Sequence, residues 1–169
     1  MGTHDIPDLT RRLESYEPAS LLAIGPQAGA LAAAYQSAHP DCRIAYLDPH
    51  GTLSGEMLLA ALVRHGRFDF VIVRGVLERV DAESGAHLIA RLRDLHTRRF
   101  CVVLPTNDGE RRWQAPELIA MGLAHWSRES GNQATLEVYG FDLGTYKTTP
   151  EWLNARHWAH PENWGKNRW

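Results

Sequence analysis

The chain has 169 residues, of which 44% are hydrophobic and 22% charged, which predicts one domain with its own apolar core. Lys and Arg number 18 against 20 Asp and Glu, for a net charge of -2, so a surface that is basic all over, as in many nucleic-acid-binding domains, is excluded. Six tryptophans are present. Four of them lie near the C-terminus: Trp152, Trp158, Trp164 and Trp169.

The cysteines and the hydropathy pattern narrow the class of protein further. Cys42 and Cys101 stand alone, without a Cys-x-x-Cys pair, so two reduced thiols are expected, with a single disulfide as the alternative. No run of about 18 apolar residues predicts a membrane span, and the N-terminal segment lacks the apolar stretch of a signal peptide. We therefore expect a cytoplasmic protein with no bound metal and no membrane contact.

Strand-like apolar runs alternate with helix-like segments in chain order. A leading helix is expected at 6–17. Strands follow at 20–25, 43–48, 68–74 and 99–106, and helices at 29–39, 54–65, 81–96 and from near Pro116 to near Gly122. Ser54 and Asp81 are the predicted N-caps of two of these helices. Two last strands, 123–130 and 135–143, flank a turn at 130–133 and should pair as a hairpin.

This order predicts an α/β fold with a doubly wound, mostly parallel, Rossmann-like sheet. Helices should cover both faces, and the C-terminal hairpin should be antiparallel. The domain is expected to span 1–146, with a tail at 147–169. Ligands of such sheets bind at the carboxyl ends of the strands, so the turns at 25–29, 48–54, 74–80 and 105–116 are where a site is expected.

Three pieces of sequence at these turns carry chemical information. The first strand ends in the segment Gly25-Pro26-Gln27-Ala28-Gly29, where glycine permits a close backbone approach and the next helix offers its N-terminus to an anion. Asp48 ends the second strand, where an acid can hydrogen-bond both hydroxyls of a ribose. The third strand, FDFVIVR, runs into GVLERV.

Together these pieces resemble the class I S-adenosylmethionine-dependent methyltransferases, as in a small, divergent bacterial-type member. That family has an LDIGCGTG-like turn, an acid after the second strand, an FD-apolar strand leading into a VLEH-like segment, and a final antiparallel hairpin. The resemblance covers about residues 20–145 and implies S-adenosylmethionine as the cofactor. The cofactor contacts that it implies are Gly25, Gln27, Gly29, Asp48, Arg74 and Gly75.

The chain also departs from the family pattern. Ala23 replaces the acid before the glycine turn, Gln27 the middle glycine, and Arg79 the histidine of the VLEH-like segment. Twenty residues lie between Asp48 and Asp69, too few for the helix-strand step that the family places there and that reads adenine. We therefore expect one outer strand of the sheet to be missing.

Two functions follow from the matches and the departures. The first is a methyltransferase that binds S-adenosylmethionine and acts on an unidentified small molecule or protein, with no base that the sequence identifies. The second is a non-catalytic descendant of the fold that acts as a binding or assembly module through its Trp-rich tail. The sequence leaves both open.

Each candidate residue near the strand ends has a structural alternative. Gly25 and Gly29 also suit a tight corner without ligand, and Asp48 before Pro49 suits a turn. His50 is a candidate base or substrate ligand, although a solvated loop histidine is the favoured interpretation. Glu78 and Arg79 are candidates for a charged pair at a substrate, or for a solvated pair of little energetic weight.

The loop at 105–116 borders the same crevice. Its polar and aromatic side chains suit an anionic or planar substrate or partner, or else form a surface loop with one aromatic anchor. The candidates are Asn107, Arg111, Arg112 and Trp113.

The tail at 147–169 combines tryptophans with basic residues. Packing over the domain is the favoured interpretation, with a homodimer contact or a cap on the shortened sheet as ways of burying the indoles. Stacking on single-stranded nucleic acid is the alternative, which the acidic net charge disfavours.

Overall fold

The computed structural model of the chain describes residues 6–106, 113–130, 134–146 and 166. Most of the tail at 147–169 lies outside these ranges, so its predicted packing, dimer contact and nucleic-acid contact stay predictions. Asn107, Arg111, Arg112 and most of the turn at 130–133 also lie outside the described residues.

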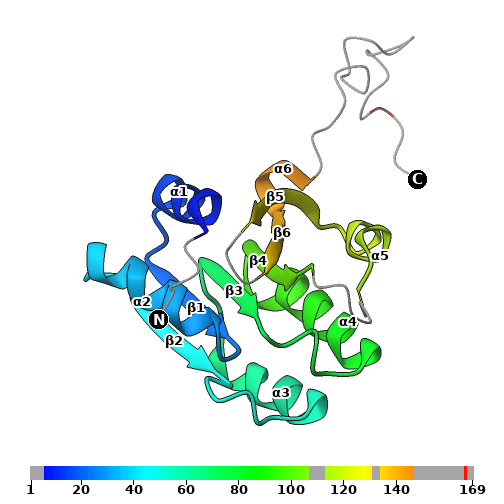
Figure 1. The fold of residues 1–169 in the computed structure, drawn as a ribbon. Coiled ribbons are helices and arrows are strands. Elements are labelled where there is room, and N and C mark those ends of the chain that lie inside the picture. Colours follow the sequence, from blue (N-terminus) through cyan, green and yellow to red (C-terminus); the bar gives the residue numbers. More distant parts are fainter. Residues whose placement is uncertain (1–5, 107–112, 131–133, 147–165, 167–169) are drawn as a thin grey trace.

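Six strands form one sheet in the order β2-β1-β3-β4-β6-β5 (Figure 1). The strands are β1 (Ser20–Ile24), β2 (Arg43–Leu47), β3 (Phe70–Arg74), β4 (Arg99–Pro105), β5 (Ala124–Ser130) and β6 (Thr135–Asp142). β2, β1, β3 and β4 run parallel, and β6 is antiparallel to both β4 and β5. The predicted doubly wound sheet with a C-terminal hairpin is confirmed.

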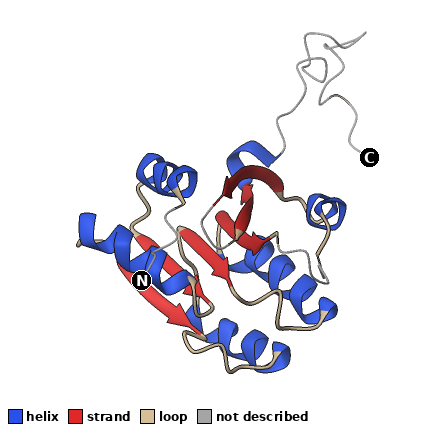
Figure 2. Ribbon diagram, in the orientation of Figure 1, coloured by secondary structure: helices blue, strands red, loops and turns tan. Residues whose placement is uncertain are grey.

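Helices cover both faces of the sheet, as Figure 2 shows. On one face, α1 (Pro7–Tyr16) and α2 (Ala28–Ala38) pack against β1 and β3. The other face carries α3 (Gly55–Leu62), α4 (Ala82–Arg91) and α5 (Ala115–Ala120). A 3-10 turn at Val63–His65 extends α3, and a π-helical turn at Leu92–His96 extends α4.

The strand sequences produce these two layers. Successive side chains of a strand point to opposite faces, so Leu22 and Ile24 enter the core under α3 and α4. Leu21 and Ala23 enter the core under α1 and α2. A strand buried on both faces must be apolar throughout, which is why these segments were recognisable in the sequence.

Both predicted N-caps are confirmed. The Ser54 hydroxyl accepts a hydrogen bond of 3.3 Å from the Met57 N–H, and the Asp81 carboxylate accepts one of 2.8 Å from the Ser84 N–H. The short helix α6 (Leu143–Tyr146) was not predicted, because four residues are too few to produce a helical periodicity.

The expected loss of an outer strand is also confirmed. Within the described residues, β2 pairs only with β1 and forms an edge of the sheet. The chain passes from β2 through residues 48–54 directly into α3. The side of the crevice next to β2 is therefore built by a short loop.

Cys42 and Cys101 are both buried, free thiols. In the described ranges, no helix has the length and apolar character needed to cross a bilayer. Those ranges also contain no group of three or more His, Cys, Asp or Glu side chains placed to hold a metal ion.

The glycine turn gives a test of the fold. Gly25 has φ +98, and a Cβ there would overlap the carbonyl oxygen of Arg74. We predict that Gly25→Ala lowers the free energy of unfolding by about 2–4 kcal/mol, because a left-handed conformation and a backbone clash both oppose the methyl group. Urea unfolding followed by circular dichroism measures this loss.

Gly29→Ala is the matched control. A Cβ at Gly29 would lie 3.5 Å from the Tyr46 ring, an ordinary contact within α2, so the change should be smaller than about 1 kcal/mol. Equal losses for the two variants would contradict the geometric argument.

Candidate functional site

The carboxyl ends of β1, β3 and β4 open into a pocket of about 430 Å³. It lies where the chain order in the sheet reverses, as the topology predicts for a ligand site. The residues that line it are Pro26, Gln27, Arg74, Gly75, Glu78, Arg79, Val103, Pro105, Ala134 and Leu136. Gln27, Arg74, Gly75 and Glu78, all predicted site residues, are thus brought together, while Gly25, Gly29, Asp48 and His50 are not among the lining residues.

The first turn is held by backbone contacts, and its glutamine fills the space above it. The Gly25 N–H donates to the Leu47 carbonyl oxygen at 2.9 Å. Gln27 is the N-cap residue of α2, but its side chain makes no cap hydrogen bond. The Gln27 amide instead lies where a Cβ on Gly75 would stand. The position of the family's middle glycine is therefore occupied by a side chain that extends to the third turn.

Asp48 is engaged by its own loop. Its Oδ1 accepts hydrogen bonds from the N–H groups of Thr52 at 2.7 Å and Leu53 at 3.2 Å, and its side chain is 1% exposed. Burial alone would raise the pKa of Asp48, but hydrogen bonds from Arg79 and these two N–H groups outweigh burial and hold that pKa below its usual range. Asp48 is therefore ionised, and its carboxylate is hydrogen-bonded to its own loop and to Arg79.

Arg79 joins the second turn to the third. Its Nη2 donates to Asp48 Oδ2 at 2.7 Å, its Nη1 to the Gly51 carbonyl oxygen at 2.7 Å, and its Nε to the Gly75 carbonyl oxygen at 2.8 Å. A Cβ on Gly51 would lie 3.2 Å from Pro26 Cγ and 3.3 Å from Arg79 Cζ. The three turns therefore meet around one guanidinium.

The cofactor implied by the family resemblance can be tested against this geometry. A ribose held by Asp48 needs an oxygen lone pair that faces the crevice. Oδ1 is bonded to two N–H groups, Oδ2 to Arg79, and the Asp48 side chain is 1% exposed. A ribose could therefore reach this carboxylate only if Arg79 moved away. The residues present do not fit the nucleoside half of the cofactor, and the geometry favours the alternative of a turn-forming Asp48.

Glu78 and Arg79 do not form the pair that the sequence suggested, because Arg79 binds Asp48. Glu78 Oε2 is buried, and among the described residues it has no hydrogen-bond partner. Burial raises the pKa of the Glu78 carboxyl, against the opposing effects of a hydrogen bond from its own backbone N–H and of the charges on Arg79 and Arg74. The pocket thus contains a carboxylate oxygen that lacks a donor.

Arg74 is a second charged residue on the pocket wall. Burial lowers the pKa of its guanidinium, and the charge of Glu78 partly offsets that effect. No ion pair or hydrogen bond joins this guanidinium to another residue in the described part of the chain. Arg74 and Glu78 are therefore opposite charges that line one pocket without being paired.

Two further predicted residues, His50 and Trp113, are not among the lining residues of the pocket. His50 is exposed, as its solvated alternative requires. Trp113 is 6% exposed and donates from Nε1 to the Leu77 carbonyl oxygen at 3.2 Å. Its ring lies against Gly85 of α4, so Trp113 fits the aromatic-anchor alternative and does not line the crevice.

Sequence reasoning missed the apolar wall and the contacts of Arg79. Val103, Pro105 and Leu136 line the pocket from β4 and β6, and their sequence pattern does not differ from that of core residues. Arg79 was recognisable as a change from the family histidine. Its partners 28 and 31 residues away could not be read from spacing.

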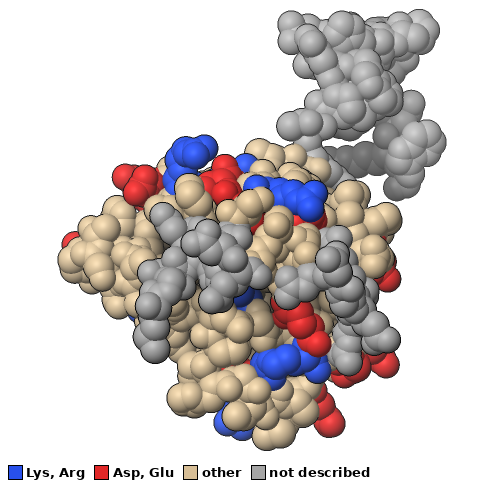
Figure 3. Space-filling view, in the orientation of Figure 1, with Lys and Arg blue, Asp and Glu red and all other residues tan. Residues whose placement is uncertain are grey.

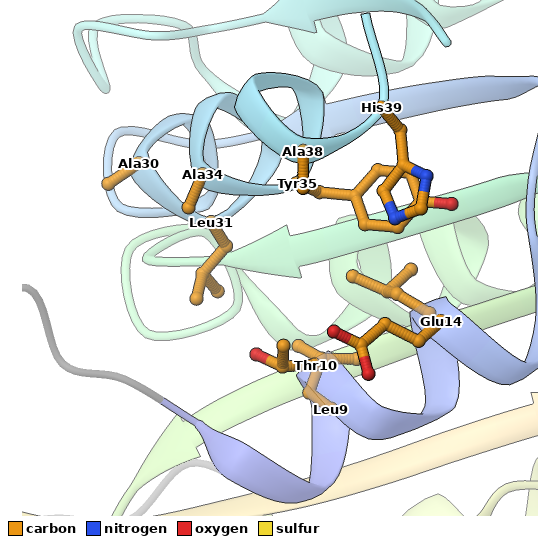
Figure 4. A pocket seen from close by; sticks show the side chains of 10 residues that line it. Leu9, Thr10, Glu14, Ala30, Leu31, Ala34, Tyr35, Ala38 and His39 are labelled. Carbon is orange, nitrogen blue, oxygen red and sulfur yellow. The ribbon is translucent and has the colours of Figure 1, made fainter.

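A separate hollow of about 310 Å³ lies between α1 and α2 (Figure 4). The Tyr35 ring stacks on the His39 ring there, with centroids 4.3 Å apart, and Leu9, Thr10 and Glu14 face these groups from α1. It contains none of the strand-end turns. Charged side chains on the visible face form small mixed groups rather than one basic field (Figure 3).

The contact between Asp48 and Arg79 gives a prediction with a defined pH dependence. Asp48→Asn keeps an oxygen for the Thr52 and Leu53 N–H groups but removes the charge that holds Arg79. We expect the free energy of unfolding to fall by about 1–3 kcal/mol at neutral pH. Because the folded-state pKa of Asp48 is depressed, its contribution exists above the unfolded pKa of about 4 and disappears as pH falls through the folded value.

Urea unfolding of both proteins from neutral to acidic pH measures this dependence. The difference between wild type and variant should be constant above about pH 5 and shrink below about pH 4. A difference that does not vary with pH would contradict the assigned role of the Asp48 charge.

Comparison with solved structures finds methyltransferases. One similar structure is that of a Nostoc punctiforme protein described as an O-methyltransferase, which is 14% identical to this chain. Its TM-score is 0.56, and the match covers 79% of this chain and 54% of the Nostoc protein. The Burkholderia thailandensis 1,6-didemethyltoxoflavin-N1-methyltransferase, solved with bound 1,6-didemethyltoxoflavin and S-adenosylhomocysteine, is 16% identical, with a TM-score of 0.52 and coverages of 80% and 77%.

At this level of identity, the likeness establishes a methyltransferase-like fold and no more. The chain spans 60% of the pyocyanin biosynthetic protein PhzM, also 16% identical, with a TM-score of 0.47, and about half of the Nostoc protein. A comparison with curated proteins found no match. A family model matches residues 4–169, so the chain belongs to the family described as Family of unknown function (DUF6231).

Proposed function

We propose that this chain is a non-catalytic, methyltransferase-fold protein that binds a small molecule in the crevice between β1, β3 and β4, without S-adenosylmethionine. The observation that carries this proposal is the triple contact of Arg79 with Asp48, Gly51 and Gly75. It ties together the turns between which a nucleoside would have to lie.

The strength of the bond between Arg79 and Asp48 determines how much affinity for a nucleoside is lost. A hydrogen bond to a charged group is worth about 1.5–3 kcal/mol. Asp48 is buried but the Arg79 side chain is 32% exposed, so water weakens this bond in part and the upper end of the range is a ceiling. A ribose competing for Asp48 must first break that bond. A loss of about 3 kcal/mol corresponds to roughly a hundredfold in affinity.

The methionine half of the cofactor lacks its partners as well. Ala23, in place of the family's acid, is buried inside β1 and has no group to hold an amine. The Gln27 amide occupies space beside Gly75 that an unsubstituted turn would leave open. Both changes, like the contact of Arg79 with Asp48, should weaken the binding of S-adenosylmethionine.

A pocket still remains for a smaller ligand. Its volume of about 430 Å³ falls within the range of small-molecule sites, which combine apolar walls with a few polar groups. Asp48 is bound by its loop and by Arg79 and does not line the pocket, and among the described residues Glu78 is the one carboxyl on the pocket wall. We therefore assign binding and derive no catalytic step.

The second candidate function is an S-adenosylmethionine-dependent methyltransferase. The left-handed turn at Gly25 before α2 favours it, because a helix N-terminus can receive an anionic group. The solved Burkholderia methyltransferase that shares the fold holds S-adenosylhomocysteine. For this candidate, Arg79 would have to leave Asp48 when the cofactor binds.

Calorimetric titration separates the two candidates. S-adenosylmethionine, S-adenosylhomocysteine and 5'-methylthioadenosine should produce no saturable heat with the folded wild-type protein at concentrations up to about 1 mM, a range that detects binding free energies stronger than about -4 kcal/mol. Micromolar binding of any of the three would contradict the proposal and support the methyltransferase.

The variant Arg79→Ala provides the internal control. Freeing Asp48 should raise the affinity for S-adenosylhomocysteine above that of wild type, by up to roughly a hundredfold. Adding Asp48→Asn to that variant should abolish the gain. A gain that survives the second substitution would show that the Asp48 contact is not what excludes the nucleoside.

A further inference from the structure

We propose that the crevice pocket binds an α-amino acid with an apolar side chain, with the ligand's ammonium group at Glu78 and its carboxylate at Arg74. This inference rests on the proposed function, since it identifies the ligand class of the same pocket. It starts from two opposite charges that line one cavity. In the described part of the chain, Glu78 Oε2 has no hydrogen-bond partner, and the Arg74 side chain forms neither a hydrogen bond nor an ion pair.

The Glu78 carboxylate favours a ligand with a hydrogen-bond donor. A buried polar atom without a partner is unfavourable by about 1–3 kcal/mol, and more when it is charged. Glu78 Oε2 is such an atom, on a residue that lines a cavity large enough for a ligand. The oxygen itself is covered, so the side chain must turn before a ligand can contact it. An ammonium group carries three donors and a positive charge, so it satisfies this oxygen better than a neutral hydroxyl does.

The Arg74 guanidinium favours a ligand with a hydrogen-bond acceptor. Its side chain is partly buried at the end of β3, and the guanidinium presents several N–H donors in one plane. Carboxylates match that plane with two parallel hydrogen bonds. A carboxylate is therefore the group that this side chain recognises best.

The two charges together define the ligand. An anion alone would leave Glu78 unsatisfied and be repelled by it, and a cation alone would do the same at Arg74. Arg74 and Glu78 do not form an ion pair with each other within the described residues, so a molecule with both charges satisfies each without breaking an internal bond. An α-amino acid is the smallest common molecule of this kind.

The rest of the pocket selects the side chain. Val103, Pro105 and Leu136 form an apolar wall, and burying a leucine-sized side chain against such a wall contributes about 1.5–3 kcal/mol. Arg79 closes the side on which a nucleoside would lie. These features favour an amino acid such as leucine, methionine or phenylalanine over a charged one or a nucleoside conjugate.

The test compares L-leucine with two analogues that each lack one charge, 4-methylpentanoate and 3-methylbutylamine. Titration calorimetry and thermal unfolding of the full chain should both detect saturable leucine binding. Each analogue should bind at least about tenfold more weakly, because each leaves one of the two half-buried charges of the pocket unpaired. The inference would be overturned if leucine, methionine and phenylalanine, each at about 10 mM, all fail to bind or stabilise the folded protein. At this concentration, even a ligand with a dissociation constant of about 1 mM would be detected.

Variants assign the contacts. Glu78→Gln should weaken leucine binding at least about tenfold and change 4-methylpentanoate binding little, because that analogue has no ammonium group. Arg74→Gln should weaken leucine but not 3-methylbutylamine. Glu83→Gln is the matched control, since Glu83 is exposed on α4 and its loss should leave leucine affinity unchanged. Equal leucine affinity in wild type, Glu78→Gln and Arg74→Gln would overturn the inference.

A ligand-free measurement separates binding from folding. Because Glu78 Oε2 has no partner to lose, Glu78→Gln should leave the melting temperature unchanged or raise it while binding is lost. A large fall in melting temperature would mean that the carboxylate has a structural role, which contradicts the assignment.

The outcomes also distinguish this inference from the proposed function. If neither leucine nor 5'-methylthioadenosine binds, the amino-acid inference fails and the exclusion of the nucleoside stands. If both bind to wild type, the amino-acid pocket stands and the exclusion of the nucleoside fails.

Discussion

The bond between Asp48 and Arg79 is the contact on which the crevice depends. Asp48 orders the loop after β2 by accepting hydrogen bonds from the Thr52 and Leu53 N–H groups. Arg79 links that loop to the third turn through its hydrogen bonds to Asp48 and Gly75. In a sheet with another strand beyond β2, neighbouring backbone would support this loop. Here β2 is an edge within the described residues, so a side-chain contact provides the support.

This arrangement links the shortened sheet to the altered turns. A shorter connection brings the 48–54 loop close to Pro26 and Arg79. The arginine can hydrogen-bond two turns at once, whereas a histidine has too few donors to make three separate hydrogen bonds. Gln27 then packs over Gly75, which has φ +74 and no Cβ. The departures from the methyltransferase pattern therefore form one connected change rather than a set of unrelated losses.

Much of the fold could be predicted because its signals are local. The strands buried on both faces are continuous apolar runs, Ser54 and Asp81 begin their helices, and the short interval after Asp48 indicated the missing strand. The positions of Gln27, Arg74 and Glu78 at one crevice followed from topology alone. The partners of Arg79 and the burial of Trp113 against α4 could not be predicted, because they depend on side-chain directions across turns that are distant in sequence.

The unsatisfied oxygen of Glu78 is the strongest indication that the crevice retains a function. Among the described residues, two buried side-chain oxygens lack a hydrogen-bond partner, Glu78 Oε2 and Ser127 Oγ. A serine hydroxyl is neutral, so leaving it unpaired is a modest penalty, whereas a carboxylate beside a cavity is a larger one. Ser127 lies on β5, away from the strand-end turns. A fold that satisfied Asp48 with three hydrogen bonds had the means to satisfy Glu78 in the same way, through Arg74 four residues earlier. That it leaves these two residues of one pocket wall without an ion pair between them is what a binding site requires of its free state, since groups already paired with each other have less to gain from a ligand.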